Sequence, residues 1–268
     1  MPLTIFQVAV RFSKKKLYSV LFLRIRSFQN AFLAMVMALC TITGSAQSVV
    51  KSSVTANAAS GSVAVNKPTG TVEGDLLVAC LTFNTGSSAT LTVPTGWTLI
   101  ARTNQTTTVG LATYYRVAGA SEAASYTWGS SSRWTIGIIR ISGANTTTPI
   151  QVSAANSSGT ASTSVGAPAV TTTAANSLVL AFYTNNNIST YTAATGTFEQ
   201  YDAPYSATSP SNMLATFIKD VAGSTGTLTA TSSNSAAWAA QQVAINPSTN
   251  LIFNSSGSLL SVKWIILL

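Results

Sequence analysis

The sequence feature that most constrains the fold is an internal sequence repeat between the two halves of the chain, here called the echo. Five landmarks recur in the same order at an offset of about 100 residues: 75–79 (DLLVA) with 177–181 (SLVLA), 95–97 (TGW) loosely with 195–198 (TGTF), 111–113 (LAT) with 214–216 (LAT), 117–119 (VAG) with 221–223 (VAG), and Trp134 with Trp238. This period corresponds to a sheet-sized unit and is much longer than a solenoid repeat. The echo therefore predicts that residues 75–142 and 177–246 form equivalent sets of strands, with Trp134 and Trp238 in corresponding places.

The chain between residues 47 and 250 has the composition of β-structure. Runs rich in β-branched and aromatic residues alternate with Gly, Asn, Ser and Pro clusters, and no long segment has apolar residues at helical spacing. The expected strands include residues 76–83, 89–93, 97–102, 110–117, 134–141, 177–183, 213–219 and 239–245. Hydrophobic residues make up 46% of the chain, which is enough to build a core. The predicted class is all-β.

Two arrangements of the duplicated halves are open, namely two small sandwiches in tandem or two half-sets of strands around one core. No polar, Pro-rich linker separates the halves. We therefore expect residues 47–247 to form a single antiparallel β-sandwich of ten or more strands with an internal pseudo-duplication.

The N-terminal 46 residues have the layout of an export signal. Arg24 and Arg26 precede an apolar run at 31–43, and small residues follow at 44–46. An apolar run of this length is too short to cross a hydrocarbon core of about 30 Å. We predict a signal helix, cleavage after Ala46 and a mature N-terminus at Gln47, which makes the protein secreted or displayed at the cell surface and in contact with a membrane only during export. An uncleaved membrane anchor is the alternative.

The charge distribution argues against nucleic acid as a partner. The net charge of +8 comes largely from six basic residues before residue 27. From residue 47 onward there are eight basic and six acidic residues, and they are scattered. Binding to phosphates needs a clustered basic face, so we expect no nucleic-acid binding.

Several motifs resemble a recurrent exported bacterial module that also occurs in phage tails and appendages. They are residues 73–79 (EGDLLVA), 94–98 (PTGWT), 114–118 (YYRVA), 126–128 (YTW) and 237–238 (AW), so the resemblance spans about residues 48–247. The resemblance implies a concanavalin-like or jelly-roll sandwich and brings no catalytic residues with it. Residues 259–264 (LLSVKW) resemble the start of a C-terminal sorting domain, so we interpret residues 248–268 as a tail that begins a truncated further domain.

Residues for catalysis are scarce, so we expect no enzyme. The chain contains no histidine, which excludes Ser-His-Asp and Cys-His catalysis and removes the commonest transition-metal ligand. No phosphate-binding glycine motif occurs, and we expect neither a cofactor nor a metal. Cys80 is expected to be a small buried hydrophobe. Asp75 is expected to bond backbone amides in a turn, and Glu122 to form an exposed ion pair with Arg116.

Aromatic residues remain as candidates for ligand binding. An indole or phenol ring offers apolar area to a sugar, although packing in the core is the alternative for Trp97, Trp134 and Trp238. Residues 198–205 (FEQYDAPY) resemble a loop that combines two tyrosines with carboxylates and an amide, which suits polyol recognition, although a plain surface loop is the alternative. The candidate ligand-binding residues are Trp97, Glu199, Tyr201, Asp202 and Tyr205.

Together these observations favour an exported, non-catalytic binding or adhesion module whose partner is a polysaccharide or a cell-surface glycan. The alternative is a structural component of an extracellular appendage, coat or virion fibre, which the low charge and the Thr-rich composition would suit. A glycan ligand would bind with little salt dependence, because the mature body carries little net charge.

Overall fold

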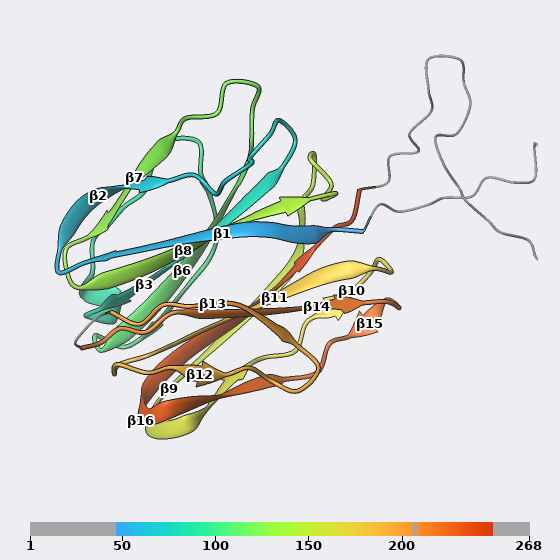
Figure 1. The fold of residues 1–268 in the computed structure, drawn as a ribbon. Helices are drawn as coiled ribbons and strands as arrows, with labels where there is room; N and C mark the ends of the chain where they lie inside the picture. The colour runs from blue at the N-terminus through green and yellow to red at the C-terminus, as the bar shows by residue number, and fades with distance from the viewer. Residues whose placement is uncertain (1–46, 206–207, 249–268) are drawn as a thin grey trace, which may run out of the picture. The chain divides into compact units, whose positions relative to one another are not determined.

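The computed structural model describes residues 47–205 and 208–248, and they form antiparallel β-structure (Figure 1). This confirms the predicted all-β class. The first half of the described chain contains β1 (Val49–Ala58), β2 (Gly61–Asn66), β3 (Leu76–Asn84), the short 3-10 helix η1 (Gly86–Ser88), β4 (Leu91–Thr92), β5 (Thr98–Gln105), β6 (Val109–Val117), β7 (Ser125–Ser130) and β8 (Trp134–Ser142). The second half contains β9 (Ile150–Ala167), β10 (Thr171–Thr172), β11 (Ser177–Asn185), β12 (Tyr191–Thr192), β13 (Phe198–Asp202), β14 (Met213–Lys219), β15 (Gly223–Ser224) and β16 (Leu228–Ile245).

The two halves have the same strand order. The first large sheet runs β1-β8-β3-β6-β5, and in the second β9 pairs with β16, followed by β11, β14 and β13. Phe83 lies opposite Trp134 in the first half, and Asn185 lies opposite Trp238 in the second. The pairing confirms the predicted equivalence of the duplicated strands and of the two tryptophans.

Part of the sequence echo is out of register with the strands. Because Leu76 lies opposite Val117 and Leu178 lies opposite Ile218, position 117 corresponds to position 218. The equivalent of residues 111–113 is therefore 212–214, two residues before the matching letters. A shift of two residues keeps each side chain on the same face of the sheet, so the duplicated pattern of inward and outward positions survives.

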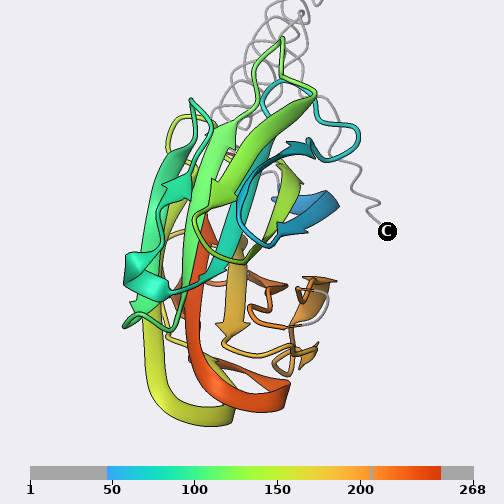
Figure 2. The same cartoon turned by 90° about the vertical axis from the view of Figure 1, so that its left-hand side faces the viewer.

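A small sheet covers the outer face of each large sheet. In the first half it consists of β2, β7 and β4. In the second half, β9 and β16 are each 18 residues long and bend together out of the large sheet, so that their far ends pair with each other and β16 pairs with β12 (Figure 2). The first half makes the same corner with turns between β1 and β2 and between β7 and β8. The fold thus has small, large, large and small sheets in succession.

The central strands β3 and β11 are buried at every position. One face of each packs into a core shared by both halves, which includes Val78, Cys80, Leu180 and Phe182. The other face packs against the small sheet of its own half. Burial on both faces explains why these strands are continuous apolar runs and not alternating ones. The fold combines both arrangements left open by the sequence, since each half has its own inner core and the two also share one.

Residues of unequal size meet between the two halves. A Cβ on Gly137 of β8 would lie 2.5 Å from the phenol oxygen of Tyr201 and closer still to its ring, so the absent side chain makes room for the tyrosine. The equivalent pair on the other side is Gln241 and Ala101. There the Thr113 hydroxyl donates to Gln241 Oε1 (2.8 Å), and Gln241 Nε2 donates to Thr103 Oγ1 (2.9 Å). These differences specify how the two halves fit together.

The chain ends predicted from the sequence lie mostly outside the described residues. The signal helix, the cleavage site after Ala46 and residues 249–268 are not described. The described ends meet at Gly143, whose carbonyl accepts from the Ser48 hydroxyl (3.2 Å) and from the Ser248 N–H (2.8 Å). Within residues 47–205 and 208–248, no helix is long and apolar enough to span a membrane.

Candidate functional site

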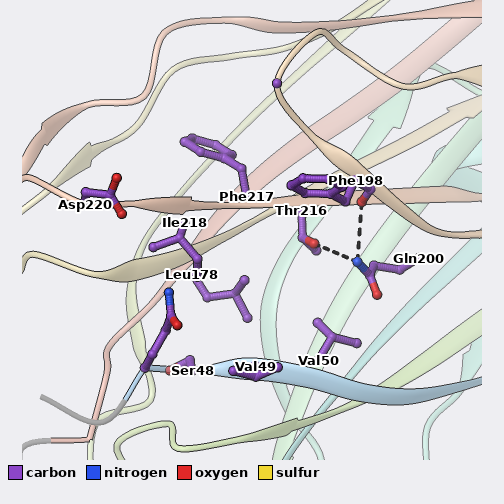
Figure 3. A pocket seen from close by; sticks show the side chains of 12 residues that line it. Ser48, Val49, Val50, Leu178, Phe198, Gln200, Thr216, Phe217, Ile218 and Asp220 are labelled. Atoms are coloured by element: carbon purple, nitrogen blue, oxygen red, sulfur yellow. Dashed lines mark hydrogen bonds between the residues drawn. The ribbon is translucent and has the colours of Figure 1, made fainter.

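A groove opens between the start of β1 and strands β13 and β14, where the edge of one half faces the edge of the other. Its volume is about 460 Å³. Figure 3 shows Phe198 and Phe217 along one wall, Ser48, Val49 and Val50 of β1 along the other, and Leu178 and Ile218 between them. The remaining lining residues are Gln47, Gly196, Gln200, Thr216 and Asp220. The groove therefore offers apolar walls with a few polar groups, as ligand sites usually do.

Phe198 is the most exposed large hydrophobic side chain of this groove, with 73% of its surface accessible. The turns at Gly96 (φ 84°) and Gly196 (φ 81°) are equivalent, so Trp97 corresponds to Thr197 and Thr98 to Phe198. Successive residues of a strand point to opposite faces. The displacement of the aromatic residue by one position therefore places Trp97 in the inner core and Phe198 in the groove.

A β-bulge in β13 decides which of the following side chains reach the groove. The pairing of β13 with β14 shifts between Glu199 and Tyr201, so that Tyr201 lies opposite Leu214. Leu214 faces the shared core, and Tyr201 enters that core beside it. The same bulge occurs in β5 between Leu99 and Ala101. Without the bulge, the alternation along β13 would turn Tyr201 away from the core.

Gln200, the residue at the bulge, supplies the polar end of the groove. Its Nε2 donates to Thr216 Oγ1 (2.9 Å) and to the Phe198 carbonyl (3.4 Å), as the dashed lines in Figure 3 show. These bonds fix the carboxamide next to the Phe198 ring. An amide held beside an exposed aromatic ring can bond ligand hydroxyls at the rim of a stacked sugar.

Two carboxyl groups of β13 differ in their surroundings. Glu199 is exposed, whereas Asp202 is half-buried and accepts from the Tyr191 N–H at Oδ2 (2.7 Å). Burial raises the pKa of Asp202 to about 6, the nearby Glu199 charge adds to this effect, and the Tyr191 N–H opposes it. Its Oδ1 is buried and has no hydrogen-bond partner among the described residues. Asp202 thus joins β13 to β12, behind the groove and not in it.

The structure brings together few of the residues that the sequence singled out. Tyr201 was expected in a surface loop, which is wrong, because residues 198–202 form β13 and Tyr201 is 8% exposed. Its hydroxyl donates to Asn212 Oδ1 (3.3 Å), and burial, with the adjacent Cys80, raises its pKa well above the ordinary value. Tyr205 is half-buried, and its N–H donates to the Pro210 carbonyl (2.9 Å). Neither tyrosine lines the groove.

Trp97 is packed into the aromatic core of the first half. Its ring meets Tyr126 and Trp128 edge to face, with centroids 5.1 and 5.0 Å apart. This is the core alternative considered for Trp97, and its low exposure leaves no face for a sugar. Phe198 and Gln200 belong to the segment 198–205 that the sequence singled out, but neither was among the candidate ligand-binding residues, and Asp220 was missed. Phe198 could have been found from the sequence, because it lies one position beyond Thr197, the residue that corresponds to Trp97.

The equivalent place in the first half is covered. Arg116 corresponds to Phe217, and its guanidinium lies over Gly96 and donates to the Thr95 carbonyl (3.2 Å), whereas the space beside Gly196 is open. Arg116 is held by Glu122 at 2.8 Å, which confirms the expected pair. The expected exposure is wrong, because the Glu122 side chain is 3% exposed. Burial would raise the pKa of Glu122, but bonds from Gly119, Tyr126 and Arg116 lower it overall.

Other titratable groups of the described chain serve the fold. Asp75 accepts from the Val72 N–H (2.8 Å), as expected, and also from Arg140 Nε (2.6 Å). Cys80 is fully buried, and burial raises the pKa of its thiol, so it is packed as a small hydrophobe, as expected. Residues 47–205 and 208–248 contain no group of three or more Cys, Asp or Glu side chains placed to hold a metal ion.

Comparison of the chain with protein-family models, with curated proteins and with solved structures finds no match. The groove must therefore be interpreted from its own chemistry.

Proposed function

We propose that this protein is an exported, non-catalytic module that binds a polysaccharide in the groove between β1 and β13–β14. The observation that carries the proposal is the exposed Phe198 ring beside the fixed Gln200 amide. Exposing an aromatic ring to water is unfavourable unless a ligand covers it, and the apolar face of a pyranose suits such a ring. The groove is open at the surface, which suits an extended polymer.

The sheet edges beside the groove support recognition over assembly into a fibre. Edge strands can pair with another chain unless a bulge or a charge prevents it. Here β1 has a bulge at Lys51, and β13 has one at Gln200 next to Glu199. Both Lys51 and Glu199 are exposed. Strand-to-strand assembly at this groove is therefore disfavoured, and ordered assembly without any ligand would support the alternative of an appendage or coat component.

The finer fold type and the cellular location belong to the same proposal. Each half pairs a large antiparallel sheet with a small one, which supports the concanavalin-like or jelly-roll type implied by the resemblance. The signal-like residues 1–46 support secretion or cell-surface display. The absence of histidine from the sequence supports a protein without catalysis and without a cofactor.

A glycan array followed by calorimetry tests the proposed function. We expect a hit whose affinity falls by about 1–2 kcal/mol, about 5- to 30-fold, on Phe198→Ala, because the substitution removes the stacking surface. Leu99→Ala is the matched control, since Leu99 is 51% exposed but does not line the groove. Binding should change little between low and high salt. Failure of every glycan to bind, or equal losses in the two variants, would contradict the proposal.

A further inference from the structure

The lining of the groove also carries information about the charge of its ligand. Among the described residues that line it, the formally charged one is Asp220, at the far end from Gln200 (Figure 3). A ligand in the groove therefore meets negative charge at the Asp220 end, whereas the exposed Glu199 of β13 does not line the groove.

The uncharged groups of the groove match the surface of a neutral sugar. Phe198, Phe217, Leu178 and Ile218 offer apolar area to ring faces. Because its Nε2 bonds Thr216 and the Phe198 carbonyl, Gln200 retains its Oε1 as an acceptor for a hydroxyl. The Asp220 carboxylate can accept from two neighbouring hydroxyls.

We infer that the groove selects uncharged polysaccharides and rejects polymers that carry carboxylates; this inference rests on the proposed function. A carboxylate on the polymer that lies near Asp220 would be repelled, and no cation among the described lining residues could pair with it. Rejection by unfavourable charge is a common source of specificity. An uncharged polymer loses nothing to this repulsion and keeps the stacking and hydroxyl contacts.

The test uses an uncharged glucan, mannan and galactan, each beside its own carboxymethylated form, with the secreted protein in calorimetry at about 50 mM salt. We expect at least one neutral polymer to bind, and its carboxymethylated form to bind at least about tenfold more weakly. Asp220→Asn should strengthen binding of the carboxymethylated form about 2- to 5-fold, the range typical of exposed charges. The same substitution should weaken binding of the neutral polymer by up to about threefold, because the amide offers one acceptor oxygen in place of two.

The outcomes separate the two proposals. If the carboxymethylated form binds as well as the neutral one, or Asp220→Asn leaves its binding unchanged, the inferred selectivity is refuted while the binding function stands. If an aminated form of the same polymer binds more than about tenfold better than the neutral one, attraction of positive charge and not a neutral ligand explains the groove. If none of the neutral or carboxymethylated polymers binds, the proposed function itself fails.

Discussion

Replacing Gly137 with alanine should strongly destabilise the protein, because the new methyl group has no room. It would lie 2.5 Å from the phenol oxygen of Tyr201 and closer still to the ring, which is fixed between the two large sheets. In an ordinary strand, Gly→Ala stabilises by about 0.5–1 kcal/mol. Overpacking typically costs about 1–3 kcal/mol. Because the overlap here is with a rigid ring, we expect a loss of about 3 kcal/mol or more.

A double-mutant cycle identifies the ring as the cause. Tyr201→Ala alone should cost about 3–5 kcal/mol, as truncation of a buried aromatic usually does. In the double variant the methyl group occupies space that the ring has vacated. The double variant should therefore lose no more stability than Tyr201→Ala alone. The coupling between the two sites should then be at least about 3 kcal/mol, well above the scatter between independent sites.

Urea unfolding followed by tryptophan fluorescence measures these free energies. The control is Ala101→Gly, at the position equivalent to Tyr201 in the first half, which should cost about 1 kcal/mol or less. If Gly137→Ala is neutral or stabilising, or if the two substitutions are additive, the two halves do not pack as described. If Gly137→Ala fails to fold while the double variant folds, the clash with the Tyr201 ring is the cause of the failure.

Three further effects follow from the packing. The pKa of Asp202 is raised to about 6, so its contribution to stability is full below the unfolded pKa near 4 and is lost as the pH rises through 6. After allowance for partial exposure, we expect the free energy of unfolding to fall by about 1 kcal/mol between pH 5 and 7.5. Asp202→Asn should remove this pH dependence in urea titrations. Trp134→Phe should lower the free energy of unfolding by about 1 kcal/mol more than Trp128→Phe in the same assay. The reason is that Trp134 Nε1 donates to the Gly61 carbonyl (3.0 Å), whereas Trp128 Nε1 has no partner among the described residues. Equal losses of stability in the two variants would contradict this prediction. The thiol of Cys80 should react with a thiol reagent only at the rate of unfolding, and fast labelling of native protein would refute its burial.

Much of the strand layout could be predicted from the sequence, because buried strands carry a strong signal. The run at residues 76–83 is apolar on both faces, and β3 occupies nearly that span. Strands β1, β2 and β9 were missed, since they are rich in Ser, Thr and Ala and half-exposed. Their place in the sheets comes from pairing with distant strands, which local composition does not encode.

The candidate site was harder to predict, because single-residue shifts decide it. The bulge in β13 turns Tyr201 into the core, and a displacement by one position puts Phe198 in the groove where Trp97 is buried in the other half. The aromatic content of residues 198–205 made this segment a candidate, and two of its residues, Phe198 and Gln200, line the groove. Which ring of the segment faces solvent depends on strand register, and register is set by partners about 15 residues further along the chain.

Chemical-shift mapping with an oligosaccharide from the best-binding glycan tests the central claim most directly. The signals to follow are the side-chain amide of Gln200 and the methyl groups of Val50 and Ile218, which line the groove. We expect these signals to shift in a saturable way, while the methyl groups of Ile100 and Val117, at the equivalent positions of the first half, stay unchanged. Shifts of Ile100 and Val117 as large as those of Val50 and Ile218, or shifts confined to residues outside the groove, would contradict the account.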